Sequence, residues 1–193
     1  QSADFRQAPA IAPNYLSTEE DRRIAMLASL AVGLGLAEAA LPSPVPGIKP
    51  GLANIIVLLV AMRYGLRTAV WVAMIRLLAG SLLLGQFMAP GFWLAAVGTL
   101  TSLGMLSFAM KLPTRWFGPL SISVLMAHAH IGAQWLLAKA WLFPEANLLL
   151  LLPVFTLAAL CFGAVNGLVV AYLASDQAEA RAPAAHAHGE QNS

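Results

Sequence analysis

The stretch Leu41-Pro-Ser-Pro-Val-Pro-Gly-Ile-Lys-Pro-Gly-Leu-Ala-Asn54 lies between two apolar runs and decides how the chain is organised around it. Its closely spaced prolines cannot continue the preceding helix, because each lacks an amide donor and its ring clashes with the previous turn. The chain is therefore expected to stop, cross a short distance and begin a new helix near Pro50 or Gly51. This break carries Lys49, and Glu38 lies just before it.

The composition is that of an integral membrane protein. Of the 193 residues, 59% are hydrophobic and only 10% are charged, and the mean hydropathy is +0.73. Soluble globular domains carry about 25% charged residues. The net charge of +2 is small and the basic residues do not cluster on one polar face, which argues against nucleic acid as a partner and leaves membrane lipid as the surroundings.

The apolar runs predict an all-α membrane protein with six transmembrane helices. A helix needs roughly 20 apolar residues, within a range of about 17 to 25, to cross the hydrocarbon core of a bilayer. Five stretches reach or approach this length, and a shorter run is extended at both ends into a short or tilted span. The predicted spans are 24–41, 52–62, 66–88, 92–110, 120–142 and 147–174.

Positive charge predicts the orientation, because short cytoplasmic loops collect Lys and Arg. With six spans and a cytoplasmic amino terminus, the exported loops hold only Lys49 and Lys139, whereas eight basic residues fall in cytoplasmic segments. Both termini are therefore predicted to be cytoplasmic. The expected division is a polar cytoplasmic segment at 1–23, a six-helix transmembrane domain at 24–174 and a disordered cytoplasmic tail at 175–193.

Two of the predicted spans carry small residues at every fourth position. The first ridge is Ala25, Ser29, Gly33 and Ala37, and the second is Ala159, Gly163, Gly167 and Ala171. Such ridges let helices approach closely in lipid, where burial of apolar surface drives no association. The sequence leaves open whether each ridge meets another helix of this chain or another protein, and internal packing is the simpler expectation.

Polar side chains within the apolar spans are the candidate functional residues, since an ionisable group at the bilayer centre costs on the order of 2.5 to 3.5 kcal/mol on insertion scales. They come from separate spans and are predicted to converge toward the outer leaflet, which indicates a polar pocket open to the outside. The candidate ligand-binding residues are Glu38, Lys49, Asn54, Arg76, His130 and Gln134. The alternative is that Glu38 and Arg76 form a buried pair that only holds the fold. Asn166 is expected to be an interhelical contact.

Sequence motifs for catalysis are missing. The chain has no aspartate-rich pair for Mg²⁺-diphosphate chemistry, no glycine-rich phosphate loop and no paired cysteine motif. We therefore expect a protein that is not an enzyme, with no catalytic residue, no cofactor and no metal site.

Two segments resemble a known bacterial family. Glu38 with the proline-rich stretch through Asn54, followed by Arg76-Leu-Leu-Ala-Gly-Ser-Leu-Leu-Leu-Gly85, is similar to the family called Gx transporter or heptaprenyl diphosphate synthase component I. The resemblance covers residues 24–173. The family's His-Asn-x-x-Gln pattern is matched by His130 and Gln134, and Ile131 stands in place of its Asn.

The resemblance carries further expectations, because this family is similar to the substrate-binding S components of energy-coupling-factor transporters. It implies an S-component-like bundle in the bacterial cytoplasmic (inner) membrane that captures a vitamin-, quinone-, flavin- or isoprenoid-related ligand from outside. It also implies an energy-coupling transmembrane subunit with its ATPases as partner, contacted through Ala25, Ser29 and Gly33. The rival interpretation is a non-catalytic structural subunit or assembly factor of a membrane electron-transfer or polyprenyl-synthesis complex, with subunits of that complex as partners.

Overall fold

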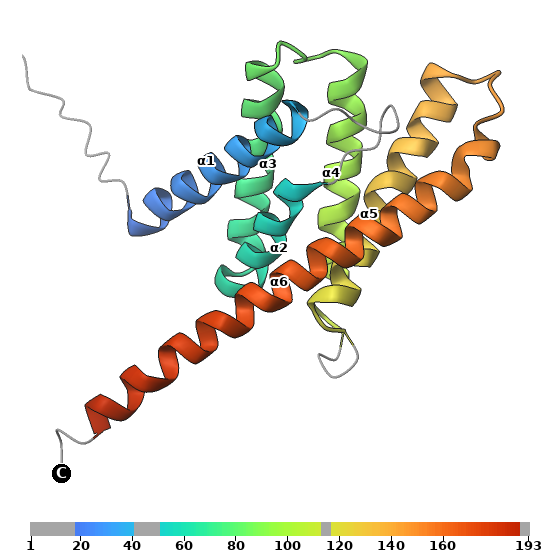
Figure 1. Cartoon of the computed structure of the whole chain (residues 1–193). Helices are drawn as coiled ribbons and strands as arrows, with labels where there is room; N and C mark the ends of the chain where they lie inside the picture. Colours follow the sequence, from blue (N-terminus) through green and yellow to red (C-terminus); the bar gives the residue numbers. More distant parts are fainter. Residues whose placement is uncertain (1–17, 41–50, 113–116, 190–193) are drawn as a thin grey trace, which may run out of the picture.

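The computed structural model describes residues 18–40, 51–112 and 117–189, and within these ranges every regular element is helical. A π-helical turn, Ala138–Leu142, extends α5, and a 3-10 turn, Leu148–Leu151, precedes α6. Successive helices run in alternating directions (Figure 1). The all-α class predicted from the sequence is confirmed. The helices are α1 Glu19–Ala40, α2 Leu52–Tyr64, α3 Leu66–Leu83, α4 Pro90–Ala109, α5 Pro119–Leu137 and α6 Leu152–Gly189.

Five of these helical segments are long and apolar enough to cross a membrane, as predicted. The exception is α2, whose 13 residues measure about 20 Å, or about two thirds of a hydrocarbon core. Large apolar side chains elsewhere are exposed, and Leu150 is 79% and Tyr172 70% exposed. An apolar exterior of this extent is typical of contact with lipid.

The short helix α2 lies at the centre of the molecule. It contacts α1, α3 and α6, and Figure 1 shows it between the longer helices. Its side chains Val57, Leu58, Val60 and Ala61 are all buried. A helix that is apolar around its whole circumference is stable only when it is enclosed, so packing rather than membrane-spanning length explains α2.

Basic residues gather at one end of the bundle, as the orientation argument requires. The guanidinium groups of Arg23, on α1, and Arg63, on α2, lie 5.0 and 5.7 Å from the centre of the Tyr64 ring. Such cation–π contacts are favourable at exposed sites. The start of α1 and the end of α2 therefore meet at the same end, which agrees with the predicted grouping of Arg23 and Arg63 in cytoplasmic segments. The cytoplasmic location of this end stays a prediction.

The carboxyl-terminal segment differs from the sequence expectation. A disordered tail was expected from Ser175, but α6 continues as helix to Gly189. The extension is rich in alanine and includes Glu179 and Arg181, and these residue types have high helix propensity. The alanine-rich composition favours helix here, although Pro183 within the extension disfavours a helix interior.

The two small-residue ridges have different roles. A Cβ added to Gly167 would lie 2.6 Å from the Cα of Leu120, and one added to Gly163 would lie 2.9 Å from the Cα of Val124. The second ridge is therefore buried against α5, which confirms internal packing for α6. On the first ridge, a Cβ added to Gly33 would meet nothing within 4 Å. At this position the first ridge therefore does not pack against the backbone of another described helix.

Replacement of Gly167 by Ala should therefore destabilise the protein, because the added methyl group meets the backbone of α5 and the two helices must move apart. Overpacking of this kind costs about 1 to 3 kcal/mol. The measurement is the thermal unfolding midpoint of the purified protein in detergent. Gly33→Ala is the matched control, and we expect its midpoint to stay near that of wild type. Equal midpoints for the two variants would contradict the assignment of the second ridge to the α5–α6 interface.

Candidate functional site

The break before α2 ends inside the bundle, at Gly51. This residue has φ 69° and ψ 32°, the left-handed conformation that glycine adopts without strain. Its N–H donates to the carboxylate of Glu38 on α1, and its carbonyl accepts a 3.2 Å hydrogen bond from the amide of Asn166 on α6. Both backbone groups of Gly51, the residue just before α2, thus bond to side chains from other helices, and its carbonyl also accepts a 2.8 Å hydrogen bond from the N–H of Asn54.

Arg76 of α3 extends this network. Its Nη1 donates a 3.3 Å hydrogen bond to Oδ1 of Asn54, in the first turn of α2. The carboxylate of Glu38, which is only 6% exposed, is close enough to act electrostatically on the guanidinium. Among the described residues these two groups form no direct salt bridge, since Glu38 is bonded to Gly51 and Arg76 to Asn54. The two charges therefore interact without direct hydrogen bonding, and whether the pair serves only the fold stays open.

His130 and Gln134 lie one turn apart on α5, and the Nε2 atoms of the two side chains are 3.1 Å apart. They pack against Gly98 of α4, where an added Cβ would lie 2.9 Å from the His130 ring and 3.0 Å from Gln134. Glycine at this position therefore lets α4 approach the two polar side chains. Arg76 is near enough to act electrostatically on the imidazole, which connects α5 to the network around Gly51.

We refer to these residues together as the polar core. Its members come from α1, α2, α3, α5 and α6, and the short stretch just before α2. They are Glu38, Gly51, Asn54, Arg76, His130, Gln134 and Asn166.

The polar core lies deeper than the sequence suggested. Asn54 and Arg76 are each roughly ten residues, or about 15 Å, from the end of the bundle where α2 stops and α3 begins. That distance is about half of a 30 Å hydrocarbon core, whereas the sequence placed Asn54 at the outer end of its span. The difference arises because α2 begins within the bundle rather than at its outer edge.

The structure brings together five of the six predicted ligand-binding residues, and the sixth, Lys49, lies outside the described residues. Three contributors, Gly51, Asn166 and Gly98, were not predicted as site residues, although Gly51 was expected near the start of the helix. Asn166 was expected to be an interhelical contact, which its bond to Gly51 confirms, but its membership of the polar core was missed. Gly98 was missed because a glycine in an apolar run carries no local signal of what packs against it.

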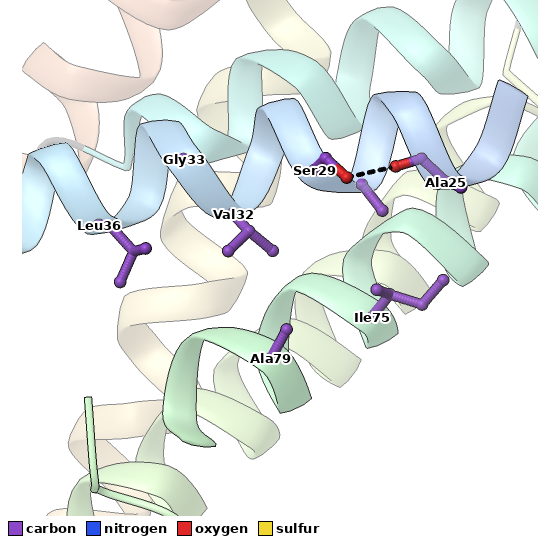
Figure 2. Close-up of a pocket in the computed structure, with 8 residues that line it drawn as sticks. Ala25, Ser29, Val32, Gly33, Leu36, Ile75 and Ala79 are labelled. Carbon is purple, nitrogen blue, oxygen red and sulfur yellow. Dashed lines mark hydrogen bonds between the residues drawn. The ribbon is translucent and has the colours of Figure 1, made fainter. Parts of the chain in front are cut away.

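The first small-residue ridge lines an open groove of about 510 Å³ between α1 and α3. Figure 2 shows Ser29 and Gly33 of α1 facing Ile75 and Ala79 of α3 across it. The Ser29 hydroxyl donates a 2.8 Å hydrogen bond to the carbonyl of Ala25, so it leaves the groove surface mostly apolar. The predicted partner residues Ala25, Ser29 and Gly33 therefore share one surface, and none of the polar core residues lines it.

Comparison with known proteins gives one match. A family model described as heptaprenyl diphosphate synthase component I matches residues 27–173, which include the polar core and most of the groove. No curated protein and no solved structure matches.

The bond between Glu38 and Gly51 can be separated from the charge of Glu38 by two substitutions. Glu38→Ala should destabilise the protein by about 1 to 3 kcal/mol, because the buried N–H of Gly51 loses its acceptor. Glu38→Gln keeps an acceptor oxygen and should recover much of that loss. Thermal unfolding in detergent measures both. A glutamine variant as unstable as the alanine variant would show that the charge, and not the hydrogen bond, holds α2 in place.

Proposed function

Since the chain belongs to the heptaprenyl diphosphate synthase component I family, we propose that it is a non-enzymatic, substrate-binding subunit of a membrane transport system. In this proposal the protein resembles the S components of energy-coupling-factor transporters. It lies in the bacterial cytoplasmic membrane with both termini in the cytoplasm. It binds a small vitamin-, quinone-, flavin- or isoprenoid-related ligand that enters from outside.

The observation that carries the proposal is the convergence of Glu38, Asn54 and Arg76 inside an apolar bundle. Ionisable groups are rare at such depth, and they commonly mark a substrate pathway or binding site. A guanidinium has five N–H donors, and among the described residues Arg76 donates one hydrogen bond, to Asn54. It therefore keeps donors for an anionic group on a ligand. Lys49, near the start of α2 in sequence, would add a second positive charge.

The groove between α1 and α3 supports a separate partner site. It is apolar and has small residues on both walls, including Ala28 on α1 and Ala79 on α3. Transmembrane helices associate through such surfaces, because small side chains allow close backbone approach. We assign the groove to a helix of an energy-coupling transmembrane subunit, which would contact Ala25, Ser29 and Gly33 and link the protein to ATPases.

A second function is favoured by a different feature of the polar core. Glu38, Asn54 and Asn166 are already hydrogen-bonded within the protein, so the network also serves to hold α1, α2, α3 and α6 together. A non-catalytic structural subunit or assembly factor would need only this. The family description names a component of a synthase, and the word component implies association with other subunits.

Replacement of Arg76 by Ala should remove ligand binding, because it deletes the positive charge of the polar core. The measurement is native mass spectrometry of the gently purified protein, comparing the amount of retained small molecule with wild type. The exposed Arg67→Ala variant is the control and should retain the ligand at wild-type level. Unchanged retention in a folded Arg76→Ala variant, or wild-type protein that holds only other subunits, would favour the structural role.

Replacement of Gly33 by Leu should block the groove without disturbing the fold, since no atom lies within 4 Å of the added Cβ. The expected result is loss of the co-purifying partner with the small molecule retained. Gly104→Leu is the matched control, because Gly104 is an exposed glycine of α4 that also has nothing within 4 Å. Partner retention by the Gly33→Leu variant in a quantitative pull-down would exclude the groove as the partner site.

A further inference from the structure

Within the described residues 18–40, 51–112 and 117–189, three buried polar atoms have no hydrogen-bond partner. They are Oγ1 of Thr99 and Oγ of Ser102, both on α4, and Nδ1 of His130 on α5. Thr99 is 5% and Ser102 3% exposed. Leaving a buried polar group unpaired costs about 1 to 3 kcal/mol, so each such group in a native structure calls for an explanation. Three such atoms on two neighbouring helices point to a binding role.

Several hydroxyl groups in the described helices bond to a backbone carbonyl one turn earlier. Thr99 and Ser102 form no such bond, although α4 continues for more than three residues before and after both of them. They are therefore oriented for something other than the local backbone. The hydroxyls of Ser29, Thr68, Thr101 and Thr156 each donate to the carbonyl oxygen four residues earlier.

The unpaired atoms lie beside the polar core. Ser102 is one turn from Gly98, so it shares the face of α4 that packs against His130. Thr99 is three residues before Ser102 and lies within the same turn. Helices α3 and α4 run antiparallel, so the end of α3 and the start of α4 lie at the same end of the bundle. Thr99 is about 14 Å from the start of α4, and Arg76 is about 11 Å from the end of α3. The two residues therefore lie at similar depth.

The hydrogen bond between His130 and Gln134 determines whether Nδ1 of His130 is a donor or an acceptor. An amide nitrogen can only donate, so Nε2 of His130 accepts from Nε2 of Gln134. In a neutral imidazole the proton is then on Nδ1, which becomes a donor. Two buried hydroxyl groups and one ring N–H are thus available as donors on neighbouring helices, where the backbone of Gly98 also acts on the His130 ring.

We propose that Thr99, Ser102 and Nδ1 of His130 bind the acidic group of the ligand, a carboxylate or a phosphate. This assignment rests on the proposed function, and it adds α4 as a wall of the ligand site. The positive charge of Arg76 acts on the His130 ring, and neither α4 nor α5 carries an acidic residue that would repel an anion. The acidic group nearest in this network is Glu38, which already accepts from Gly51.

The test compares a Thr99→Val/Ser102→Ala double variant with wild type in phosphatidylcholine nanodiscs. The probes are octanoate, inorganic phosphate and phosphatidic acid added to the nanodisc lipid, and the readout is the probe-dependent shift of the thermal unfolding midpoint. We expect at least one probe to stabilise wild type and its apparent affinity to fall by about tenfold or more in the double variant, since two hydrogen bonds to a charged group are lost.

Two further variants separate binding from folding. Thr101→Val removes a neighbouring hydroxyl that is already bonded to Val97, and Thr99→Ser keeps a hydroxyl at the site, so both should respond to the probes like wild type. Without a probe the double variant should melt no lower than wild type, because the two hydroxyls that it removes have no hydrogen-bond partner in the described part of the chain.

The outcomes distinguish a lipid headgroup from a free anion, and they separate failure of this assignment from failure of the proposed function. Stabilisation by phosphatidic acid alone identifies a lipid headgroup, whereas stabilisation by octanoate or inorganic phosphate identifies a free small molecule. Equal responses in wild type and the double variant, or no response to any probe, would overturn the assignment of Thr99, Ser102 and His130. If Arg76→Ala still loses its small molecule in that case, the proposed function stands and only the α4 wall is wrong.

Discussion

The structure depends on how the first backbone groups of α2 are satisfied. A helix that begins inside an apolar bundle has amide groups with no partner in its own helix and no water to replace it. Here the carboxylate of Glu38 accepts from the N–H of Gly51, and the amide of Asn166 donates to its carbonyl. Glycine supplies the left-handed conformation that places both groups. An acidic residue deep in the bundle is therefore explained first by backbone chemistry.

The hydrogen bond from Gly51 to Glu38 also affects the positive charge of Arg76. Because Glu38 is engaged with Gly51, it does not form a direct salt bridge with Arg76, whose guanidinium instead bonds Asn54. The positive charge is thus held in position by Asn54, and Glu38 acts on it without a direct bond. Such a group is suited to an anionic ligand, since a buried cation gains most from an oppositely charged partner that also accepts its hydrogen bonds.

The two small-residue ridges differ in what they contact: the ridge on α6 packs against α5, whereas the ridge on α1 borders an open groove. Gly163 and Gly167 bring α6 against α5 until the backbones touch, and Gly98 brings α4 close to the same helix. These contacts pack α4, α5 and α6 closely together beside the polar core. The equivalent ridge on α1 leaves a groove beside α3. Ligand binding and partner binding are therefore assigned to different surfaces.

Much of this architecture could be predicted from local patterns. The apolar runs gave the helices, and Pro90 and Pro119 begin α4 and α5 because proline is well suited to the first turn. The small-residue spacing indicated close helix contacts. The depth of Asn54 and the membership of Asn166 were not predictable, since they depend on a contact between segments 115 positions apart. The unpaired hydroxyls of Thr99 and Ser102 were likewise invisible, because sequence does not reveal which hydroxyls bond to their own helix.

The most direct test of the account is the hydrogen exchange rate of the Gly51 amide, measured by NMR on isotopically labelled protein in nanodiscs. If α2 begins within the bundle and Glu38 accepts from Gly51, this amide should exchange as slowly as the interior of α3 and faster when Glu38 is replaced by Ala. Rapid exchange in wild type, at the rate of a frayed helix end at the membrane surface, would contradict the account.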